Sequence, residues 1–514
     1  MFYPRKIKGF RDIDPQLNSI RWHIINKAIE VYKLYGFEHW DTPLVEYAEV
    51  LGKYLPDIDT AAEGIYSFRN PEQEPIYDPR GNEKRDENNN VIMTNHFLAL
   101  RYDLTAPLAR LYSEKIWDKF IHNQIANGKN DLFRRYQFGP VYRYEAKIDP
   151  DRFREFWQLD FDTVGSDDVA VDAENVMILA DALQNIGLKT GKFIIKVNNR
   201  KILQGFLNSI SIYDELMHSV MRVIDKADKI GMDGVVQELG NGRTDKSEAF
   251  IEGLKLDSKL IDKIISFLSE FNDLEDRDKV LKKLESLNIN NPLYQEGIEE
   301  LKKMHRIWES LYYDSDIVIF DPKIIRGMEY YTGPIYEAEY LETYTDYKGR
   351  KRRIGSICGG GRYDNLVEKL IGLKVPAAGA SIGVDRLAQM MILTGNIPMQ
   401  IQGPVLIVVF DDNLMFEYQK IAKLLRENGI KTEIYYGQKR SLKQQLAYAD
   451  AKNAPAAILI GEDEIKEGVI TLRNLKLGKK MATQIKDKQQ WKEMVQQKIK
   501  LENLVENVKK IVFS

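Results

Sequence analysis

The sequence predicts an α/β (α+β) protein of two or three domains, and three observations support that prediction. The chain has 514 residues, which exceeds the size at which one hydrophobic core usually stops growing. Residues 138–165 have the pattern of an antiparallel hairpin, and residues from about 201 to 311 have that of charged surface helices. From residue 404 onward, apolar strands alternate with helices, which favours a mainly parallel sheet. We expect a first domain over 1–398, with a helical insertion at about 201–311, and a second over 404–514 that ends in a helix.

Composition places the chain among ordinary soluble globular proteins, since 44% of its residues are apolar and 29% are charged. Its longest apolar runs, such as Val405–Phe410, are far shorter than the roughly 20 residues that span a bilayer. The N-terminus shows no apolar secretion segment, and the one cysteine, Cys358, fits a reducing compartment. These observations predict a cytoplasmic protein that does not enter a membrane.

Charge and histidine content limit the binding sites that we expect. The six histidines lie far apart without paired ligand spacing, so no metal site made of histidine or cysteine clusters is expected. The net charge is only −3, so any contact with nucleic acid must come from local basic patches. The C-terminal region supplies such charge at Lys439, Arg440, Lys443, Arg473, Lys476, Lys479 and Lys480.

The N-terminal region predicts a helix followed by a strand. Apolar residues recur at helical spacing from Asn18 to Tyr35, Gly36 then stops the helix, and Phe37–Pro43 is typical of a strand ended by proline. The polar stretch Asn70–Asn95 is rich in Pro, Gly and Asn. We interpret it as an exposed loop or an extra hairpin, and assign it no function.

Further elements of the first domain follow from the same patterns. Leu98–Pro107 predicts a strand that runs into a helix, with Thr105 as the N-cap of that helix. Apolar periodicity predicts a helix at Ala173–Ile186, and apolar runs predict strands at Phe193–Val197 and Ile317–Phe320.

The hairpin at residues 138–165 carries more charge than a structural hairpin needs. Side chains two apart on a strand point to the same face, so Arg143 shares a face with Glu145. By the same rule, the second strand places four side chains on one face, namely Arg152, Arg154, Phe156 and Gln158. Arginines and carboxylates around an aromatic ring suit a bound nucleotide, but mixed charges are also ordinary on a solvated sheet face. Spacing alone leaves the two interpretations level.

The C-terminal region begins after the linker Gln400–Pro404. Its predicted strands are Val405–Phe410, Lys431–Tyr436, Ala456–Ile460, Val469–Leu475 and Met481–Ile485, with helices at Leu414–Glu427 and Ser441–Lys452. A final helix, with apolar positions from Trp491 to Val508, closes the chain.

The charged hairpin also carries a resemblance that separates its two interpretations. Arg143-x-Glu145, a loop, and Arg152-x-x-x-Phe156 resemble motif 2 of the class II aminoacyl-tRNA synthetases. The continuation Gln158–Asp162 is similar to the histidyl-tRNA synthetase family, in its eukaryote-like form. The resemblance implies a catalytic domain built on an antiparallel sheet.

Other stretches resemble the same family. Residues 326–331, Arg-Gly-Met-Glu-Tyr-Tyr, resemble a signature confined to it, with glutamate where aspartate is commoner, and Gly359–Asp364 is similar to its second histidine-specific stretch. Asn18–Pro43 resembles motif 1, which builds the homodimer interface, and Ala377–Leu387 resembles motif 3. The C-terminal region resembles the anticodon-binding domain of related synthetases. The HIGH and KMSKS tracts of class I synthetases do not occur in the sequence.

For L-histidine, the resemblance implies a site that meets each polar group of the amino acid. Asp103 and Thr105 would hold the ammonium group, and Asp162 with Tyr331 would pair with the two imidazole nitrogens. Arg326 would offset charge at the α-phosphate and is, with Arg143, expected to be catalytic. The complete expected set is Asp103, Thr105, Arg143, Gln158, Asp162, Arg326, Tyr330 and Tyr331.

For ATP, the resemblance implies a second set of residues. Arg143 would bind the histidine carboxylate and the α-phosphate, and Arg152 the outer phosphates. Phe156 and Arg386 would sandwich adenine, Glu145 would bind its amino group, and Mg²⁺ would bridge the phosphates. The implied activity is ATP-dependent attachment of histidine to tRNA(His) by a homodimer, through a histidyl-adenylate.

Two alternatives stay open on the sequence. One is the regulatory relative that assists ATP phosphoribosyltransferase, a binding subunit that does not aminoacylate. It lacks the C-terminal domain and the arginine that this chain has at position 326. The other is another class II synthetase, such as the glycyl or prolyl enzyme, which would leave Arg326–Tyr331 unexplained.

Overall fold

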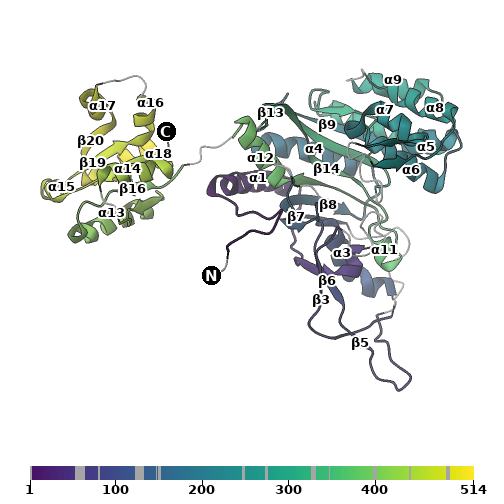
Figure 1. Cartoon of the computed structure of the whole chain (residues 1–514), viewed down its shortest axis with the longest axis horizontal. Coiled ribbons are helices and arrows are strands. Elements are labelled where there is room, and N and C mark those ends of the chain that lie inside the picture. The colour runs from purple at the N-terminus through teal and green to yellow at the C-terminus, as the bar shows by residue number, and fades with distance from the viewer. Residues whose placement is uncertain are drawn as a thin grey trace. The chain divides into compact units, whose positions relative to one another are not determined.

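The computed structural model divides the chain into two compact units, Met1–Pro398 and Met399–Ser514 (Figure 1). It describes residues 3–52, 64–78, 81–121, 132–145, 148, 152–245, 249–272, 276–325, 331–346, 348–397, 402–438, 441–481 and 487–513. No helix among these residues is long and apolar enough to cross a membrane.

Eight strands of the described residues form the central sheet of the first unit, in the order β1-β7-β8-β15-β14-β13-β9-β12. Their bounds are Glu38–His39, Phe133–Tyr142, Glu155–Val164, Ala377–Gly383, Lys351–Arg362, Pro334–Thr345, Phe193–Asn199 and Val318–Phe320. All pairs from β7 to β9 are antiparallel, and only the outermost strands, β1 and β12, pair in parallel. The expected antiparallel sheet and the hairpin at residues 138–165 are therefore confirmed.

Three helices pack together beside this sheet, α1 (Pro15–Leu34), α4 (Ala170–Ile186) and α12 (Val384–Thr394). Helix α1 begins three residues before the predicted start, because Asp14 accepts a hydrogen bond from the Leu17 N–H and Pro15 occupies the first turn. Gly36 follows it with φ of 80°, as a stop signal should. Strand β1 is shorter than predicted.

A second layer contains α3 (Thr105–Ile121) and a small sheet in the order β2-β6-β3. The three strands are Val45–Tyr47, Phe97–Leu100 and Ser67–Arg69, and α2 (Ala48–Gly52) follows the first of them. Thr105 is not the cap of α3. Asp103 accepts hydrogen bonds from the N–H groups of Thr105 and Ala106, and so takes that role two residues earlier than predicted.

The stretch Asn70–Asn95 is the extra hairpin that was one of its two interpretations. Strands β4 (Glu74–Pro75) and β5 (Met93–Thr94) pair as a stem, which Figure 1 shows leading away from the sheet. Beyond the stem the chain forms two short hairpins, marked by bridges between Tyr77 and Glu83 and between Arg85 and Val91.

Both short hairpins carry the same aspartate contact over five residues, between Asp78 and Asn82 and between Asp86 and Asn90. In each, the leading aspartate accepts a hydrogen bond from the fifth N–H at 2.9 Å, and the fourth residue has positive φ. The connection between β13 and β14 repeats this turn at Asp346–Arg350, again with a contact of 2.9 Å. These N–H donors stabilise the Asp346 carboxylate and, with Arg350 and Arg352, hold its pKa below the usual value.

The predicted helical insertion is confirmed. It contains α5 (Arg200–Ser209), α6 (Asp214–Asp225), α7 (Ala227–Leu239), α8 (Ser258–Ser269), α9 (Arg277–Ser286) and α10 (Pro292–Ser310). A hairpin of β10 (Gly242–Thr244) and β11 (Phe250–Glu252), which was not predicted, interrupts the helices.

The second unit holds a sheet in the order β17-β16-β18-β19-β20. The strands are Thr432–Ile434, Val405–Ile407, Ala456–Leu459, Val469–Asn474 and Gln496–Lys500. The first three are mutually parallel, as predicted, whereas β19 and β20 pair antiparallel. Helices α13 (Met415–Glu427), α14 (Leu442–Ala451), α15 (Glu462–Glu467) and α16 (Leu475–Met481) connect the strands.

The prediction of a single final helix was wrong. Helix α17 (Lys488–Val495) gives way to β20, and α18 (Leu504–Val512) starts only after it. Residues 496–500 pair with β19 through backbone hydrogen bonds. If they were helical, this edge of β19 would have no such partner. Of the predicted strand Met481–Ile485, Met481 ends α16 and the other residues lie outside the described ones.

Candidate active site

A cavity of about 530 Å³ opens over the middle strands of the central sheet. Every described residue of the expected site lines it: Asp103, Thr105, Arg143, Glu145, Arg152, Phe156, Gln158, Asp162, Tyr331 and Arg386. These positions come from segments that are distant in sequence, namely the start of α3, the β7–β8 hairpin, the residues before β13 and the start of α12. Arg326 and Tyr330 lie outside the described residues.

Strand β8 forms the floor of the cavity. Phe156, Gln158, Asp160 and Asp162 occupy alternate positions and therefore share its inner face. Six residues of extended chain cover about 20 Å, so Phe156 and Asp162 mark two separate ends of the site. We call them the arginine end, which contains Arg143, Arg152 and Arg386, and the acidic end, which contains Asp103, Asp160 and Asp162.

The acidic end is deeply buried, since Asp160 and Asp162 are each 3% exposed. Asp162 accepts a hydrogen bond from the Tyr363 hydroxyl, and its other oxygen lies 3.0 Å from the Arg135 guanidinium. Burial raises the pKa of both carboxyls, and the neighbouring Asp162 carboxylate raises the pKa of Asp160 further, whereas Arg135 opposes these shifts.

Acceptors outnumber donors at this end. Gln158, which lines the cavity, donates its amide N–H to the Ser381 hydroxyl at 2.8 Å. Gln158 Oε1 and Asp160 Oδ1 are buried and have no hydrogen-bond partner among the described residues. Such a set suits a ligand that brings several N–H donors, as an ammonium group and an imidazole do.

Glycines make the close packing of the acidic end possible. A Cβ at Gly379 would lie 2.3 Å from Asp162 Oδ1 and 2.8 Å from the Tyr363 hydroxyl. A Cβ at Gly360 would lie 2.4 Å from the Tyr336 ring, so that glycine serves packing rather than ligand approach. All three glycines line the cavity, but Gly359 differs because a Cβ there would meet nothing within 4 Å.

The arginine end is organised around Arg143. Its Nε donates to the Tyr102 carbonyl at 3.1 Å, and its guanidinium lies 4.4 Å from the Tyr102 ring centroid and 5.3 Å from that of Phe156. These contacts orient the guanidinium while leaving donors for an anionic ligand. Glu145 and the exposed Arg152 line the same end.

Arg154 is not on the face predicted for it. It is 9% exposed, does not line the cavity, donates to the Glu145 carbonyl at 3.1 Å and packs on the Tyr144 ring. Strand β8 begins only at Glu155, so the alternation that assigned faces does not extend back to Arg152 and Arg154.

The two residues expected around adenine are tied to one buried carboxylate. Asp385 precedes Arg386 in the first turn of α12, and it accepts a hydrogen bond at 3.0 Å from the N–H of Trp157, the residue after Phe156. Asp385 also pairs with Arg21 of α1 at 2.8 Å. The positions of Phe156 and Arg386 are thus fixed through their neighbours in the chain.

Sequence reasoning missed three residues of this site, Asp160, Tyr363 and Asp385. Asp160 was within reach, because alternation along β8 places it between Gln158 and Asp162 on the same face. Tyr363 stood in the glycine-rich stretch but had no assigned partner, since its contact to Asp162 joins positions 201 residues apart. No pattern in the sequence signals that pairing.

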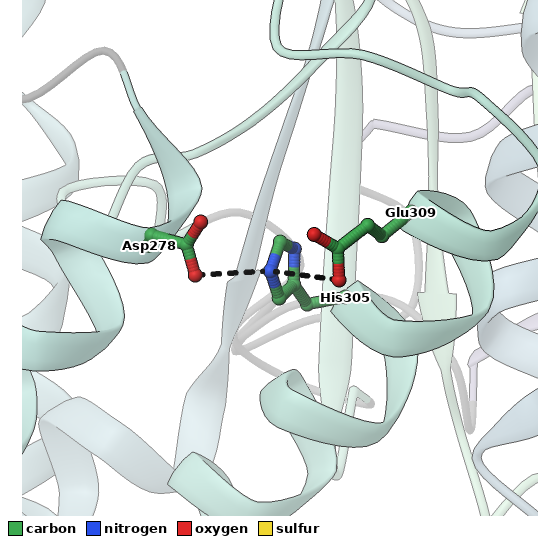
Figure 2. Close-up of side chains that lie close together, drawn as sticks. All are labelled: Asp278, His305 and Glu309. Carbon is green, nitrogen blue, oxygen red and sulfur yellow. Dashed lines mark hydrogen bonds and ion pairs between the residues drawn. The ribbon is translucent and has the colours of Figure 1, made fainter.

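Outside the cavity, Asp278 of α9 and His305 and Glu309 of α10 form the one group of three potential metal ligands found among the described residues. Figure 2 shows His305 between the carboxylates, with Nε2 3.2 Å from Asp278 and 4.0 Å from Glu309. A metal-bound histidine normally donates its second ring N–H, yet His305 Nδ1 is buried without a partner among the described residues. We interpret the group as a contact that ties α9 to α10.

The arrangement is suited to joining a cationic amino acid to a polyanion. Buried carboxylates and an amide can hold ammonium and imidazole groups at one end, while arginines can hold phosphates at the other. Both reacting groups would then lie along one rigid strand, which favours an in-line attack by positioning and charge compensation.

Comparisons with known proteins agree with this geometry. The family model for histidyl-tRNA synthetase matches residues 83–387, and that for an anticodon binding domain matches residues 404–511. A histidine–tRNA ligase of Ruegeria sp. (strain TM1040) is 39% identical over 99% of this chain and 96% of the relative. One from Paracoccus denitrificans (strain Pd 1222) is 40% identical over 98% and 97%. A crystal structure of histidyl-tRNA synthetase from Nostoc sp. PCC 7120 has a TM-score of 0.70 and 27% identity, covering 99% of this chain and 100% of the other.

Proposed function

The chain belongs to the histidyl-tRNA synthetase family, and from this premise we propose that it activates L-histidine with ATP and attaches it to tRNA(His). It is thus a class II aminoacyl-tRNA synthetase, a histidine–tRNA ligase. The observation that carries the proposal is the cavity along one face of β8, with an acidic end near Asp162 and an arginine end near Phe156. Neither a glycine nor a proline substrate would need buried acceptors beyond those for its amino group.

In the proposed histidine site, Asp103 and Thr105 bind the ammonium group, and Asp162 with Tyr331 and Gln158 bind the imidazole. The two buried acceptors without a partner at this end, Gln158 Oε1 and Asp160 Oδ1, support that assignment, since histidine supplies N–H donors at both of its ends. Asp160 is added to the expected set, because it lies on the same face of β8. It contributes negative charge or, when protonated, a donor.

In the proposed ATP site, Arg143 binds the α-phosphate and the histidine carboxylate, and Arg152 the outer phosphates. Phe156 and Arg386 enclose adenine, and Glu145 accepts a hydrogen bond from its amino group. Mg²⁺, when bound, would supply charge neutralisation at the phosphates. The pairing of Asp385 with the Trp157 N–H supports the adenine assignment.

Arg326 is proposed to stabilise charge at the α-phosphate during adenylate formation. Its guanidinium is permanently cationic, so it acts most strongly as charge develops in the transition state. Arg326→Ala should lower kcat for adenylation by about 10²–10³-fold, the usual scale for one lost electrostatic stabiliser. Full activity with a lowered melting temperature would mean instead that Arg326 serves only stability.

The second unit is proposed to bind the tRNA anticodon. The match of residues 404–511 to an anticodon binding domain supports this assignment, as do exposed or half-buried basic residues at Lys443, Arg473, Lys476 and Lys479. Lys439 and Arg440 lie outside the described residues.

We also propose a homodimer formed through Asn18–Pro43. A patch of aromatic side chains supports it: Trp22 of α1 is 41% exposed and contacts Phe138 and Trp157, and the exposed His39 stacks on Phe138. Exposed aromatic surface of this kind marks interfaces. Light scattering at micromolar concentration should give twice the chain mass, and a monomer with intact activity would contradict the proposal.

The test of the function is ATP–pyrophosphate exchange with each amino acid in turn. Exchange should require histidine, with other amino acids disfavoured by roughly 10⁴–10⁵, because buried acceptors would be left unpaired. Equal exchange with glycine or proline would point to another class II synthetase. Binding of histidine without any exchange would point to the regulatory alternative, which the names and coverage of the full-length relatives do not favour.

A further inference from the structure

We infer that Arg135 is a positioning residue, which orients the Asp162 carboxylate through a buried chain of polar side chains that begins at the surface at Asp41. The inference rests on the proposed function, because it explains how a carboxylate of the proposed histidine site is held. Arg135 does not line the cavity, and neither does Gln137, the side chain that Arg135 contacts next in this series of hydrogen bonds. Their action on the site is therefore indirect.

The inner half of this series of polar side chains joins β7 to β8. Arg135 lies directly opposite Asp162 in the strand register and its side chain is 1% exposed. One of its terminal nitrogens lies 3.0 Å from Asp162 Oδ2 and also donates to the Leu104 carbonyl at 2.8 Å. The other donates to Gln137 Oε1 at 3.1 Å. The guanidinium is therefore held from three sides.

The outer half joins β7 to the segment after β1. Gln137 is fully buried, and its amide nitrogen donates to Asp41 Oδ1 and to the Thr42 hydroxyl, each at 2.9 Å. Asp41 is exposed and Thr42 is buried. Both belong to Asn18–Pro43, the segment proposed to form the dimer interface. Four side chains thus connect that segment to the proposed imidazole-binding carboxylate.

Arg135 is the cation that keeps Asp162 in its accepting form. The titratable and charged groups that bear on this carboxyl are Arg135 of β7, Tyr363 after β14, Asp160 of β8, Asp103 before α3, and Tyr32 of α1. Only Arg135 among them is cationic. Burial raises the pKa of Asp162 and Arg135 lowers it, so removing Arg135 must raise that pKa further. The protonated fraction of the carboxyl then rises, which removes negative charge, and raising the pH restores that charge.

The experiment compares Arg135→Met, which removes the charge, with Arg135→Lys, which keeps it. Histidine-dependent pyrophosphate exchange is measured from pH 6.5 to pH 9 with the full-length protein. Arg135→Met should raise the histidine KM at pH 7 by about 10- to 100-fold, the scale of one charge-assisted hydrogen bond, and the increase should shrink towards pH 9. Arg135→Lys should recover most of the loss, and the ATP KM should change little in both variants.

Arg134→Met is the matched control, because Arg134 neighbours Arg135 on β7 but faces the other side of the sheet, where it pairs with Glu174 and packs on the Phe37 ring. It should lower the melting temperature without a pH-dependent change in histidine KM. If Arg135→Met does not fold, Gln137→Met replaces it, with a smaller rise expected in the same direction and with the same pH dependence.

Three outcomes would overturn the inference: an unchanged histidine KM, a KM raised equally at every pH, or no recovery in Arg135→Lys. A wild-type protein without histidine-dependent exchange would instead contradict the proposed function. The two failures are therefore distinguished by the wild-type measurement alone.

Discussion

The two ends of the cavity are built in different ways. At the acidic end, Asp162 lies within a strand and is 3% exposed, and its partners are Arg135 of β7 and Tyr363, the residue after β14. At the arginine end, Arg143 directly follows the last residue of β7, and the exposed Arg152 lies three residues before the start of β8. Under the proposed function, the amino acid would therefore meet a preorganised site, whereas the larger nucleotide would meet side chains that can adjust.

The strongest test of this contrast is Asp162→Asn. The variant keeps the shape of the side chain but removes its charge, and it leaves Arg135 buried without a carboxylate. We expect the histidine KM to rise by about 100-fold, the upper range for a hydrogen bond to a charged group, and the unfolding free energy to fall by about 3–5 kcal/mol. Steady-state exchange kinetics and chemical denaturation measure the two effects. Equal changes in the KM of histidine and of ATP would contradict a division into two ends.

Gly379→Ala tests whether packing, rather than charge alone, sets the acidic end. The new methyl group would displace Asp162 or Tyr363, because the space is occupied at 2.3 Å and 2.8 Å. Overpacking of this kind should lower the unfolding free energy by about 1–3 kcal/mol and raise the histidine KM.

Gly359→Ala is the matched control for Gly379→Ala. A methyl group there meets nothing within 4 Å, so the melting temperature should stay unchanged. If both variants melt alike, the packing explanation of Gly379 is wrong.

Arg152→Ala should have the smallest effect, and only on the nucleotide. The side chain is exposed, so its contribution to phosphate binding should be about 1 kcal/mol or less and should decrease with added salt. We expect a few-fold rise in the ATP KM at low ionic strength, an unchanged histidine KM and an unchanged melting temperature. A loss as large as that of Asp162→Asn would show that the arginine end is as preorganised as the acidic one.

Local patterns predicted what lies within one element, and they failed where an element ended or where distant segments met. Alternation along β8 correctly grouped Phe156 with Gln158, but it failed at Arg154, one residue before the strand begins. The prediction of one C-terminal helix failed for a related reason, since residues 496–500 form a strand only because β19 is beside them. The partners of Asp162 lie on β7 and directly after β14, and such contacts follow from the sheet order rather than from any local signal.

The repeated turn at Asp78–Asn82, Asp86–Asn90 and Asp346–Arg350 has a consequence for how this protein can vary in length. In each turn the leading aspartate accepts the N–H of the fifth residue, and this contact needs no partner from the rest of the domain. The stem residues Pro75 and Met93 already pair side by side. Residues between them can therefore be inserted, deleted or replaced by another peptide, at only the modest entropic cost of closing a longer loop. This hairpin is thus a suitable place to insert a tag or probe without disturbing the cavity.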